Sequence, residues 1–247
     1  MTTRIHRWAL AVCAAGLLTG CSTAVATGTA PPAPPAPRPS PTVKPTSARP
    51  IPISYPARGS ARWMVAPAGT RTAGTGGRLM RYRVVVEREI KGVPAAGFAA
   101  AVGTILSDPR GWTAGGQWRF ERVGPGEPSD FTLYLATPGT RGELCGDLSD
   151  GYTSCRNGAK VVLNVARWTG GVPGYQGKLG TYRQYMVNHE VGHRLGHGHE
   201  LCPAPGALAP VMLQQTLGLH GCRPNAWPYP DGTLYQGPSG QYPAQIP

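Results

Sequence analysis

Acidic residues are scarce in this chain of 247 residues: 12 Asp and Glu stand against 24 Lys and Arg, which gives a formal charge of +12. No apolar run reaches the roughly 18 residues that a membrane-spanning helix needs, which excludes a polytopic membrane protein. Charged residues of both signs make up only 15% of the chain, whereas 35 Gly and 27 Pro together form a quarter of it. Part of the chain is therefore unable to contribute to a core.

The N-terminal residues have the features of an export signal. Two arginines precede a short apolar segment at residues 9–18, which is typical of a signal peptide, here residues 1–20. The next residues complete the sequence LTGC, which resembles the bacterial lipobox, so Cys21 is expected to be lipidated and to become the mature N-terminus. A plain secretory signal with an incidental cysteine is the alternative. The expected location is extracytoplasmic, either lipid-anchored to the outer face of the bacterial cell membrane or secreted.

Proline is concentrated in one segment. Eleven prolines lie between residues 31 and 56, among Ala, Ser, Thr and basic residues. No core can form there, so residues 21–58 are expected to be a semi-rigid, lipid-anchored linker that precedes a folded domain at residues 59–247. The basic charge favours an anionic membrane or cell-wall surface as a partner. No nucleic acid is expected, because neither a recognition motif nor a basic helix appears.

Four cysteines lie in the expected domain, and cysteines in pairs suit an oxidising compartment. They are Cys145, Cys155, Cys202 and Cys222. Three pairings are possible, and we favour Cys145 with Cys155 and Cys202 with Cys222, because each pair encloses a Gly-rich or Pro-rich loop. Metal ligation is the competing interpretation, but neither pair has the short C-x2-4-C spacing of zinc sites.

From residue 59 onward, apolar residues recur with the periods of regular structure. Strands are expected at residues 79–90, 118–123, 131–136 and 160–166, and helices at residues 95–106 and 182–195. Thr181 and Gln184 have the spacing of a capping box at the start of the second helix, and Gly196 suits the left-handed residue that ends it. The pattern predicts an α+β domain with little regular structure after the second helix.

The end of the second helix carries the chemistry, because it reads HEVGHRLGHGH from His189 onward. His189 and His193 are four residues apart, so both imidazoles leave one face of the helix about a turn apart and can share a metal ion. Glu190 flanks that face. Its carboxyl group would therefore lie near the metal without being one of the metal ligands.

Helical geometry selects the third ligand. If the helix continued through His197, that imidazole would start about 12 Å along the axis from His189, too far for Zn–N bonds of about 2.0–2.1 Å. Gly196 instead allows the chain to turn, so that His199 can swing back to the metal. The full pattern H-E-x-x-H-x-x-G-x-x-H is far more specific than its first five residues. We therefore expect one Zn2+ ion on His189, His193 and His199.

With these residues the sequence resembles the metzincin zinc metalloproteases, whose long zinc motif is matched by His189, Glu190, His193, Gly196 and His199. The resemblance implies a zincin-like α+β fold with a mixed, mostly parallel sheet and two main helices. It also implies an irregular C-terminal subdomain that carries a methionine turn beneath the metal. Residues 59–247 are similar, in addition, to a bacterial domain family of unknown function with this zinc motif.

Met212, in the sequence APVMLQ, is the candidate for that methionine, although ordinary core packing would also account for it. Some metzincins have a tyrosine two residues later as an extra zinc ligand. Gln214 occupies that place here, which argues against such a ligand. In the family an edge strand above the cleft binds the substrate backbone, and residues 160–166 are the candidate by their position in the chain.

These observations predict an extracytoplasmic zinc-dependent endopeptidase that acts on a protein or peptide substrate, with a monomer as the expected state. Zinc would polarise the scissile carbonyl and lower the pKa of a bound water. Glu190 would accept the proton of that water as general base and later pass it to the leaving amine. The alternative is a non-catalytic zinc-binding lipoprotein, either a metal buffer or a wall-associated scaffold. The presence of Glu190 argues against this alternative, because chelation of a metal does not require a glutamate beside the ligands.

Overall fold

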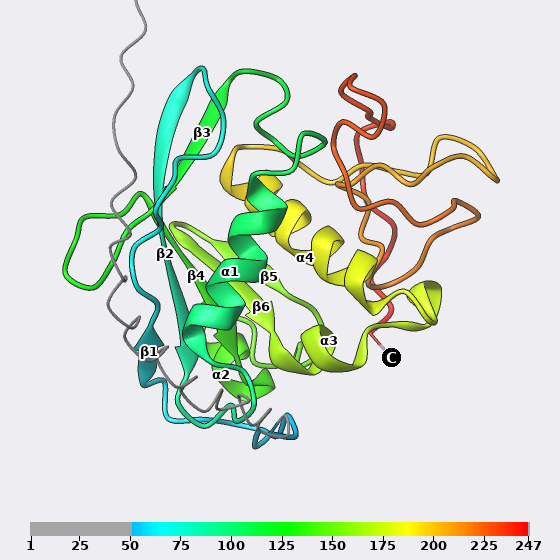
Figure 1. Cartoon of the computed structure of the whole chain (residues 1–247). Helices are drawn as coiled ribbons and strands as arrows, with labels where there is room; N and C mark the ends of the chain where they lie inside the picture. Colours follow the sequence, from blue (N-terminus) through cyan, green and yellow to red (C-terminus); the bar gives the residue numbers. More distant parts are fainter. Residues whose placement is uncertain (1–50, 247) are drawn as a thin grey trace, which may run out of the picture. The chain divides into compact units, whose positions relative to one another are not determined.

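The computed structural model describes residues 51–246 (Figure 1). The expected signal peptide, the lipidation of Cys21 and most of the expected linker lie outside the described residues. Within residues 51–246, no helix combines the length and the apolar composition needed to cross a membrane.

A six-stranded sheet forms the centre of the described unit. Its strands are β1 (Trp63–Val65), β2 (Arg78–Glu87), β3 (Trp118–Arg122), β4 (Phe131–Ala136), β5 (Cys155–Asn157) and β6 (Lys160–Asn164). Their order is β1-β2-β4-β6-β5, and β3 pairs with the first half of β2. The pairs among β2, β3, β4 and β6 are parallel, whereas β1 and β5 run antiparallel to their neighbours. The sheet is therefore mixed and mostly parallel, as predicted.

Four α-helices accompany the sheet: α1 (Ala95–Leu106), α2 (Pro138–Cys145), α3 (Val165–Gly170) and α4 (Leu179–Arg194). Helix α1 packs on β2, α4 packs on β6, and the two helices touch each other. Figure 1 shows both of them across the same face of the sheet. The core between these layers contains fully buried side chains such as Phe98, Leu133, Leu163 and Tyr182. Burial of one large apolar side chain stabilises the fold by about 1.5–3 kcal/mol.

Most predicted elements lie close to their predicted positions. Helix α1 and strand β4 have the predicted bounds. The strand predicted at residues 160–166 ends at Asn164, because the Asn164 side chain accepts a hydrogen bond from Ala166 N at 2.9 Å and caps α3. The sequence does not predict α2 and α3, because eight and six residues show too little periodicity for recognition.

Two expectations are wrong. The capping box of Thr181 and Gln184 does not form, because α4 already begins at Leu179 and its N-cap, Lys178, receives no side-chain cap. Residues 160–166 do not contain an edge strand, since β6 lies between β4 and β5. The edge strand is β5, which sequence reasoning misses because it has only three residues.

Contacts within the folded unit begin before residue 59. Lys91 N donates to Ser54 O at 2.8 Å, and Arg58 forms an ion pair with Glu143 at 3.0 Å. Residues 54–58, which the sequence assigns to the linker, therefore lie against the domain.

Residues 195–246 contain isolated bridges but no helix or strand, as predicted for the C-terminal region. Both favoured disulfides are present: Cys145–Cys155 joins α2 to β5, and Cys202–Cys222 closes a loop within the C-terminal region. In Figure 1 this region, drawn in orange and red, packs beside α4.

Candidate metal centre

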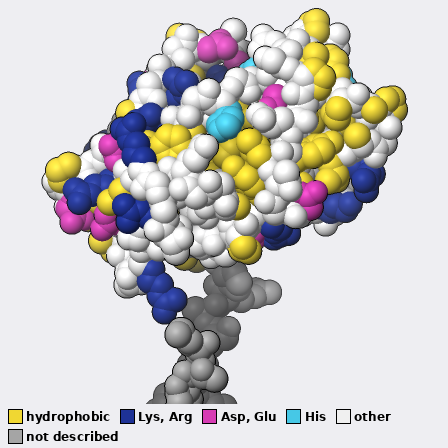
Figure 2. Space-filling model, turned by 90° about the horizontal axis from the view of Figure 1, so that it is seen from above, with side chains coloured by type: hydrophobic (Ala, Val, Ile, Leu, Met, Phe, Trp, Pro, Cys, Tyr) yellow, Lys and Arg dark blue, Asp and Glu magenta, His cyan; other side chains and the backbone are white. Residues whose placement is uncertain are grey.

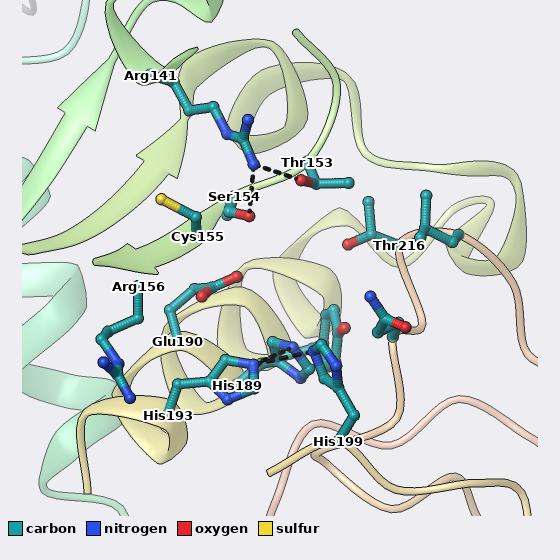
Figure 3. Close-up of a pocket in the computed structure, with 13 residues that line it drawn as sticks. Arg141, Thr153, Ser154, Cys155, Arg156, His189, Glu190, His193, His199 and Thr216 are labelled. Carbon is teal, nitrogen blue, oxygen red and sulfur yellow. Dashed lines mark hydrogen bonds between the residues drawn. The ribbon is translucent and has the colours of Figure 1, made fainter. Parts of the chain in front are cut away.

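Helix α4 carries the first three residues of the motif, and the turn after it brings the last one back. Gly196 has φ +102°, in the left-handed region that glycine favours, and His197 N donates to Gly192 O at 3.0 Å. Because of this turn, His199 joins His189 and His193 in one cluster (Figure 3).

The three imidazoles point the same ring nitrogen at one another. His193 Nε2 lies 3.2 Å from His189 Nε2 and 3.1 Å from His199 Nε2. Each Nδ1 instead lies 2.7–2.8 Å from an oxygen; these oxygens belong to Val211, His197 and Gln241. Carbonyl oxygens only accept hydrogen bonds, so each Nδ1 carries the hydrogen and each Nε2 presents a lone pair.

Three lone pairs this close repel one another unless a cation lies between them. Tetrahedral Zn–N bonds of about 2.0–2.1 Å separate two nitrogens by about 3.4 Å. The observed separations of 3.1 and 3.2 Å are near this value. Within the described residues, no second group of three His, Cys, Asp or Glu side chains converges in this way. The donor set therefore fits one Zn2+ ion.

Burial keeps two of the three histidines neutral. It lowers the pKa of His189 well below the usual value, and the neighbouring His193 and His199 lower that pKa further. Burial also lowers the pKa of His193 to about 4. Neutral imidazole is the form that binds a metal, so both side chains can act as ligands at neutral pH.

Glu190 lines a cavity of about 430 Å³ that the three histidines also line. The residue is only 5% exposed, and its Oε2 has no hydrogen-bond partner in the described part of the chain. Burial raises the pKa of Glu190 to about 8, against the lowering effect of the Arg141 and Arg156 guanidiniums. Figure 3 shows Glu190 beneath β5, on the side of α4 that faces the cavity.

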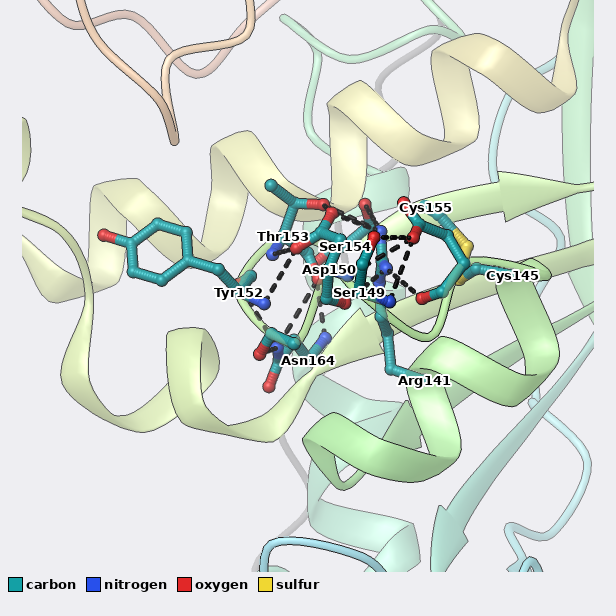
Figure 4. Close-up of polar contacts among 11 residues, drawn as sticks. Arg141, Cys145, Ser149, Asp150, Tyr152, Thr153, Ser154, Cys155 and Asn164 are labelled. Atoms are coloured by element: carbon teal, nitrogen blue, oxygen red, sulfur yellow. Dashed lines mark hydrogen bonds and ion pairs between the residues drawn. A yellow bond between two sulfur atoms is a disulfide. The ribbon is translucent and has the colours of Figure 1, made fainter. Parts of the chain in front are cut away.

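A buried arginine holds the loop that leads into β5. Arg141, on α2, forms an ion pair with Asp150 at 2.8 Å, and both side chains are buried. Its Nη2 also donates to Thr153 Oγ1 at 2.7 Å and to Ser154 O at 3.3 Å (Figure 4). Loss of one partner of a buried ion pair typically destabilises a protein by about 3–5 kcal/mol. The network therefore fixes the cavity wall next to β5.

Met212 is buried below α4, where a Cβ added to Gly192 would lie 2.5 Å from Met212 Sδ. Its carbonyl accepts from Glu200 N at 3.2 Å, and the preceding carbonyl, of Val211, is the one beside His189. The turn at residues 211–212 therefore contacts both His189 and the segment that carries His199.

His197 and Gln214, the two other positions considered as metal ligands, lie next to the histidine cluster but are not part of it. The His197 ring stacks on Trp112 with 4.4 Å between the ring centroids, and only the His197 carbonyl contacts a ligand. Gln214 lines the cavity in the place where some metzincins have a tyrosine.

Sequence reasoning misses three groups that build the site. Val211 acts through a backbone carbonyl, which no side-chain pattern reveals. Gln241 lies 42 residues from His199, in a segment without periodicity. Arg141 is a single arginine in a short helix, and such residues are usually exposed.

The chain matches the model of one protein family over residues 50–221, and that family is described as a protein of unknown function, DUF3152. The match covers well over half of the chain, so the protein belongs to this family. No curated protein and no solved structure matches the chain. The matched residues include the three histidines, Glu190 and Met212, and end before Gln241.

Proposed function

We propose that the protein is an extracytoplasmic zinc-dependent peptidase of the metzincin type. One observation carries the proposal: three converging imidazole lone pairs and a buried carboxylate, Glu190, meet at one open cavity. Peptide hydrolysis needs a Lewis acid and a base beside the same water molecule, whereas a metal store needs only the ligands.

His189, His193 and His199 would hold the ion. When bound, zinc would supply Lewis acidity, which polarises a carbonyl group and acidifies water. Glu190 would take a proton from the attacking water and pass it to the leaving amine. Glu190 is the only carboxylate among the described residues that line the cavity, which makes it the candidate for this role.

Strand β5 would bind the substrate backbone. It pairs with β6 along one side only, and Cys155 and Arg156 on β5 line the cavity. An exposed strand edge can accept an extended peptide as an additional strand. Arg156 forms no ion pair within the described residues, which leaves a free cation on this wall.

The fold is consistent with a metzincin-type domain. The motif helix lies against a mixed, mostly parallel sheet with an antiparallel edge strand, and a methionine, Met212, packs against Gly192 of that helix. The two disulfides suit an extracytoplasmic location. Lipid anchoring at Cys21 is part of the proposal. Figure 2 shows Lys and Arg side chains toward the edges of one face, which suits an anionic membrane or wall surface as a neighbour.

The replacement Glu190→Gln tests the proposal. Gln keeps the size and the hydrogen-bonding capacity of the side chain but cannot accept a proton. Cleavage of peptide and wall-peptide libraries should fall by about 100-fold to 10,000-fold, because general-base assistance is lost. Zinc content, measured by elemental analysis, and the unfolding temperature should remain at the wild-type values.

The matched control is Glu143→Gln. Glu143 is an exposed residue of α2 that forms an ion pair with Arg58, and it does not line the cavity. This replacement should leave both cleavage and zinc content unchanged. A wild-type protein that binds zinc but cleaves no library peptide would support a metal buffer or a scaffold instead. Wild-type turnover in Glu190→Gln would exclude Glu190 as the base.

A further inference from the structure

The three candidate ligands are not held with equal rigidity. His189 and His193 stand on α4, whose backbone is fixed by helical hydrogen bonds. His199 lies on an irregular segment after two glycines, Gly196 and Gly198, neither of which has another atom within 4 Å of its Cβ position. Glycine leaves the backbone its greatest conformational freedom, so the position of His199 must be set by contacts from elsewhere.

Apart from the hydrogen bond from Glu200 N to Met212 O, those contacts come from residues 236–241, which we name the C-terminal strap. Gly240 N donates to His199 O at 3.0 Å, and Leu201 N donates to Pro238 O at 2.8 Å. Between them, Glu200 and Ser239 form an antiparallel bridge. The strap therefore pairs with the segment that carries the third ligand.

A buried carboxylate fastens the strap. Glu200 is 7% exposed, and its Oε2 accepts from Gly237 N at 3.1 Å while its Oε1 accepts from Gln236 Nε2 at 3.2 Å. A Cβ on Gly237 would collide with Leu201 O, so this glycine permits the close approach of the two segments. Leaving the buried Glu200 carboxylate without these hydrogen bonds would destabilise the protein, so the strap is held in one position against residues 199–201.

The strap also reaches the ligand itself. Gln241 Oε1 lies 2.7 Å from His199 Nδ1. The corresponding oxygens for His189 and His193 are backbone carbonyls from residues 211 and 197, so only His199 depends on a side chain. An acceptor at Nδ1 fixes the tautomer that leaves Nε2 free for the metal, and it also fixes the orientation of the ring.

We propose that the C-terminal strap is part of the metal centre and that Gln241 is the positioning residue of the third ligand, His199. The proposal rests on the zinc site proposed above and extends it beyond the residues that match the family model, which end at residue 221. Gln241 acts on the affinity for zinc through His199 and does not itself contact the ion.

Zinc affinity of the full-length protein, measured by competition with a chromogenic chelator, tests this role without any substrate. Gln241→Leu removes the acceptor at an exposed position and should weaken zinc binding by about 10-fold to 100-fold, the usual effect of losing such a partner. Gln241→Glu keeps an oxygen at the same reach and should bind zinc at least as tightly as the wild type. Gln245→Leu, in the same tail but without a contact to a ligand, is the matched control and should bind as the wild type does.

The unfolding temperature in excess chelator separates positioning from general stability. It should be equal in the wild type and in Gln241→Leu, and the visible spectrum of the Co2+-loaded protein should change only in Gln241→Leu. Affinity within twofold of wild type in Gln241→Leu would overturn the strap proposal and leave the zinc site intact. Equal weakening in Gln241→Leu and Gln241→Glu would also overturn it. A wild-type protein that binds no zinc would overturn the zinc site and, with it, this inference.

Discussion

Residues 63–194 and residues 195–246 are stabilised in different ways. In the first region, backbone N–H and C=O groups are hydrogen-bonded to each other within the sheet and the helices. In the second region, isolated backbone hydrogen bonds are supplemented by hydrogen bonds from buried side chains. Gln215 Nε2 donates to Pro210 O and Asn225 O at 3.1 and 2.7 Å, and Asn225 Nδ2 donates to Ala209 O at 3.0 Å. An irregular segment can therefore be as well defined as a helix if buried amides satisfy its carbonyls.

Helix α4 connects the two regions. Tyr185 OH donates to Leu213 O at 3.0 Å and accepts from Gln215 N at 2.9 Å, and Asn188 Nδ2 donates to Ala226 O at 2.8 Å. These two side chains of α4 thus order the irregular region.

The comparison shows a division of tasks at the site. The regular region supplies Glu190 and two of the three imidazoles. The irregular region supplies the third imidazole and every oxygen that orients the three rings, namely those of Val211, His197 and Gln241. Substitutions in the irregular region that do not touch the histidines should therefore lower metal affinity more than comparable substitutions in the regular region.

The largest effect on stability is expected from loss of the Cys202–Cys222 disulfide, whose cysteines are 20 residues apart. The chain-entropy model gives a loss of about 3 kcal/mol for a loop of this size. Because the loop contains Val211 and Met212, the double variant Cys202→Ala/Cys222→Ala should also bind zinc more weakly. Urea denaturation and chelator competition measure the two effects.

The other disulfide provides the control. Cys145→Ala/Cys155→Ala opens a loop of 10 residues between α2 and β5, and this loop contains none of the oxygens that orient the imidazoles. It should lower the free energy of unfolding by a similar amount, about 3 kcal/mol, while zinc affinity stays at the wild-type value. Equal loss of zinc affinity in both double variants would contradict the division of tasks.

The same division explains what the sequence predicts. Helix α1 and strand β4 are predicted to the residue, because their apolar side chains recur with the period of the element and face one core. The histidine motif is local as well, because the proximity of His189 and His193 follows from their spacing along one helix and that of His199 from the turn at Gly196. Both disulfide pairings are also predictable, because each pair of cysteines encloses a short Gly-rich or Pro-rich loop.

What the sequence does not predict depends on tertiary contacts. Strand β5 has three residues and exists because it pairs with β6, so its own sequence carries no alternation. The start of α4 at Leu179 overrides a plausible capping box two residues later. Gln241 reaches His199 only after the strap has paired with residues 199–201, and no local rule connects positions so far apart.

A smaller effect on stability should come from Gly192→Ala, at the contact between the two regions. The added Cβ would lie 2.5 Å from Met212 Sδ and 2.7 Å from Trp112 Cζ2. The Trp112 ring cannot easily move, because its Nε1 donates to Asn188 O at 2.9 Å. Overpacking of this kind costs about 1–3 kcal/mol. Thermal unfolding measures the loss.

Gly180→Ala is the matched control on the same helix, since no atom lies within 4 Å of its Cβ position. It should stabilise the protein slightly, by about 0.4–1 kcal/mol, because alanine restricts the unfolded chain. If Gly192→Ala were as stable as Gly180→Ala, Met212 would not be packed tightly against α4.

The smallest effect is expected where a partly exposed ion pair lies at the contact between the two regions. The Arg110 side chain donates two hydrogen bonds of 2.9 Å to Asp108, and the Arg110 backbone N donates a third of the same length. The Arg110 guanidinium lies 4.4 Å from the centre of the Trp227 ring. The backbone joins the same contact, since Tyr229 N donates to Arg110 O at 3.0 Å. Because exposed ion pairs contribute little, Asp108→Asn should lower the free energy of unfolding by only about 0.2–1 kcal/mol at pH 7.

The pH dependence of that difference identifies its cause. The hydrogen bond from Arg110 lowers the pKa of Asp108 below its usual value of 3.8. A carboxyl group whose pKa is lower in the folded state stabilises the protein above the unfolded pKa, and this contribution disappears as the pH falls through the folded pKa. The wild type and Asp108→Asn should therefore differ at pH 7 and converge in acid, as measured by urea denaturation in excess chelator to remove any effect of metal loss. A difference that persisted at the lowest pH would show that Asp108 connects the two regions by its shape and not by its charge.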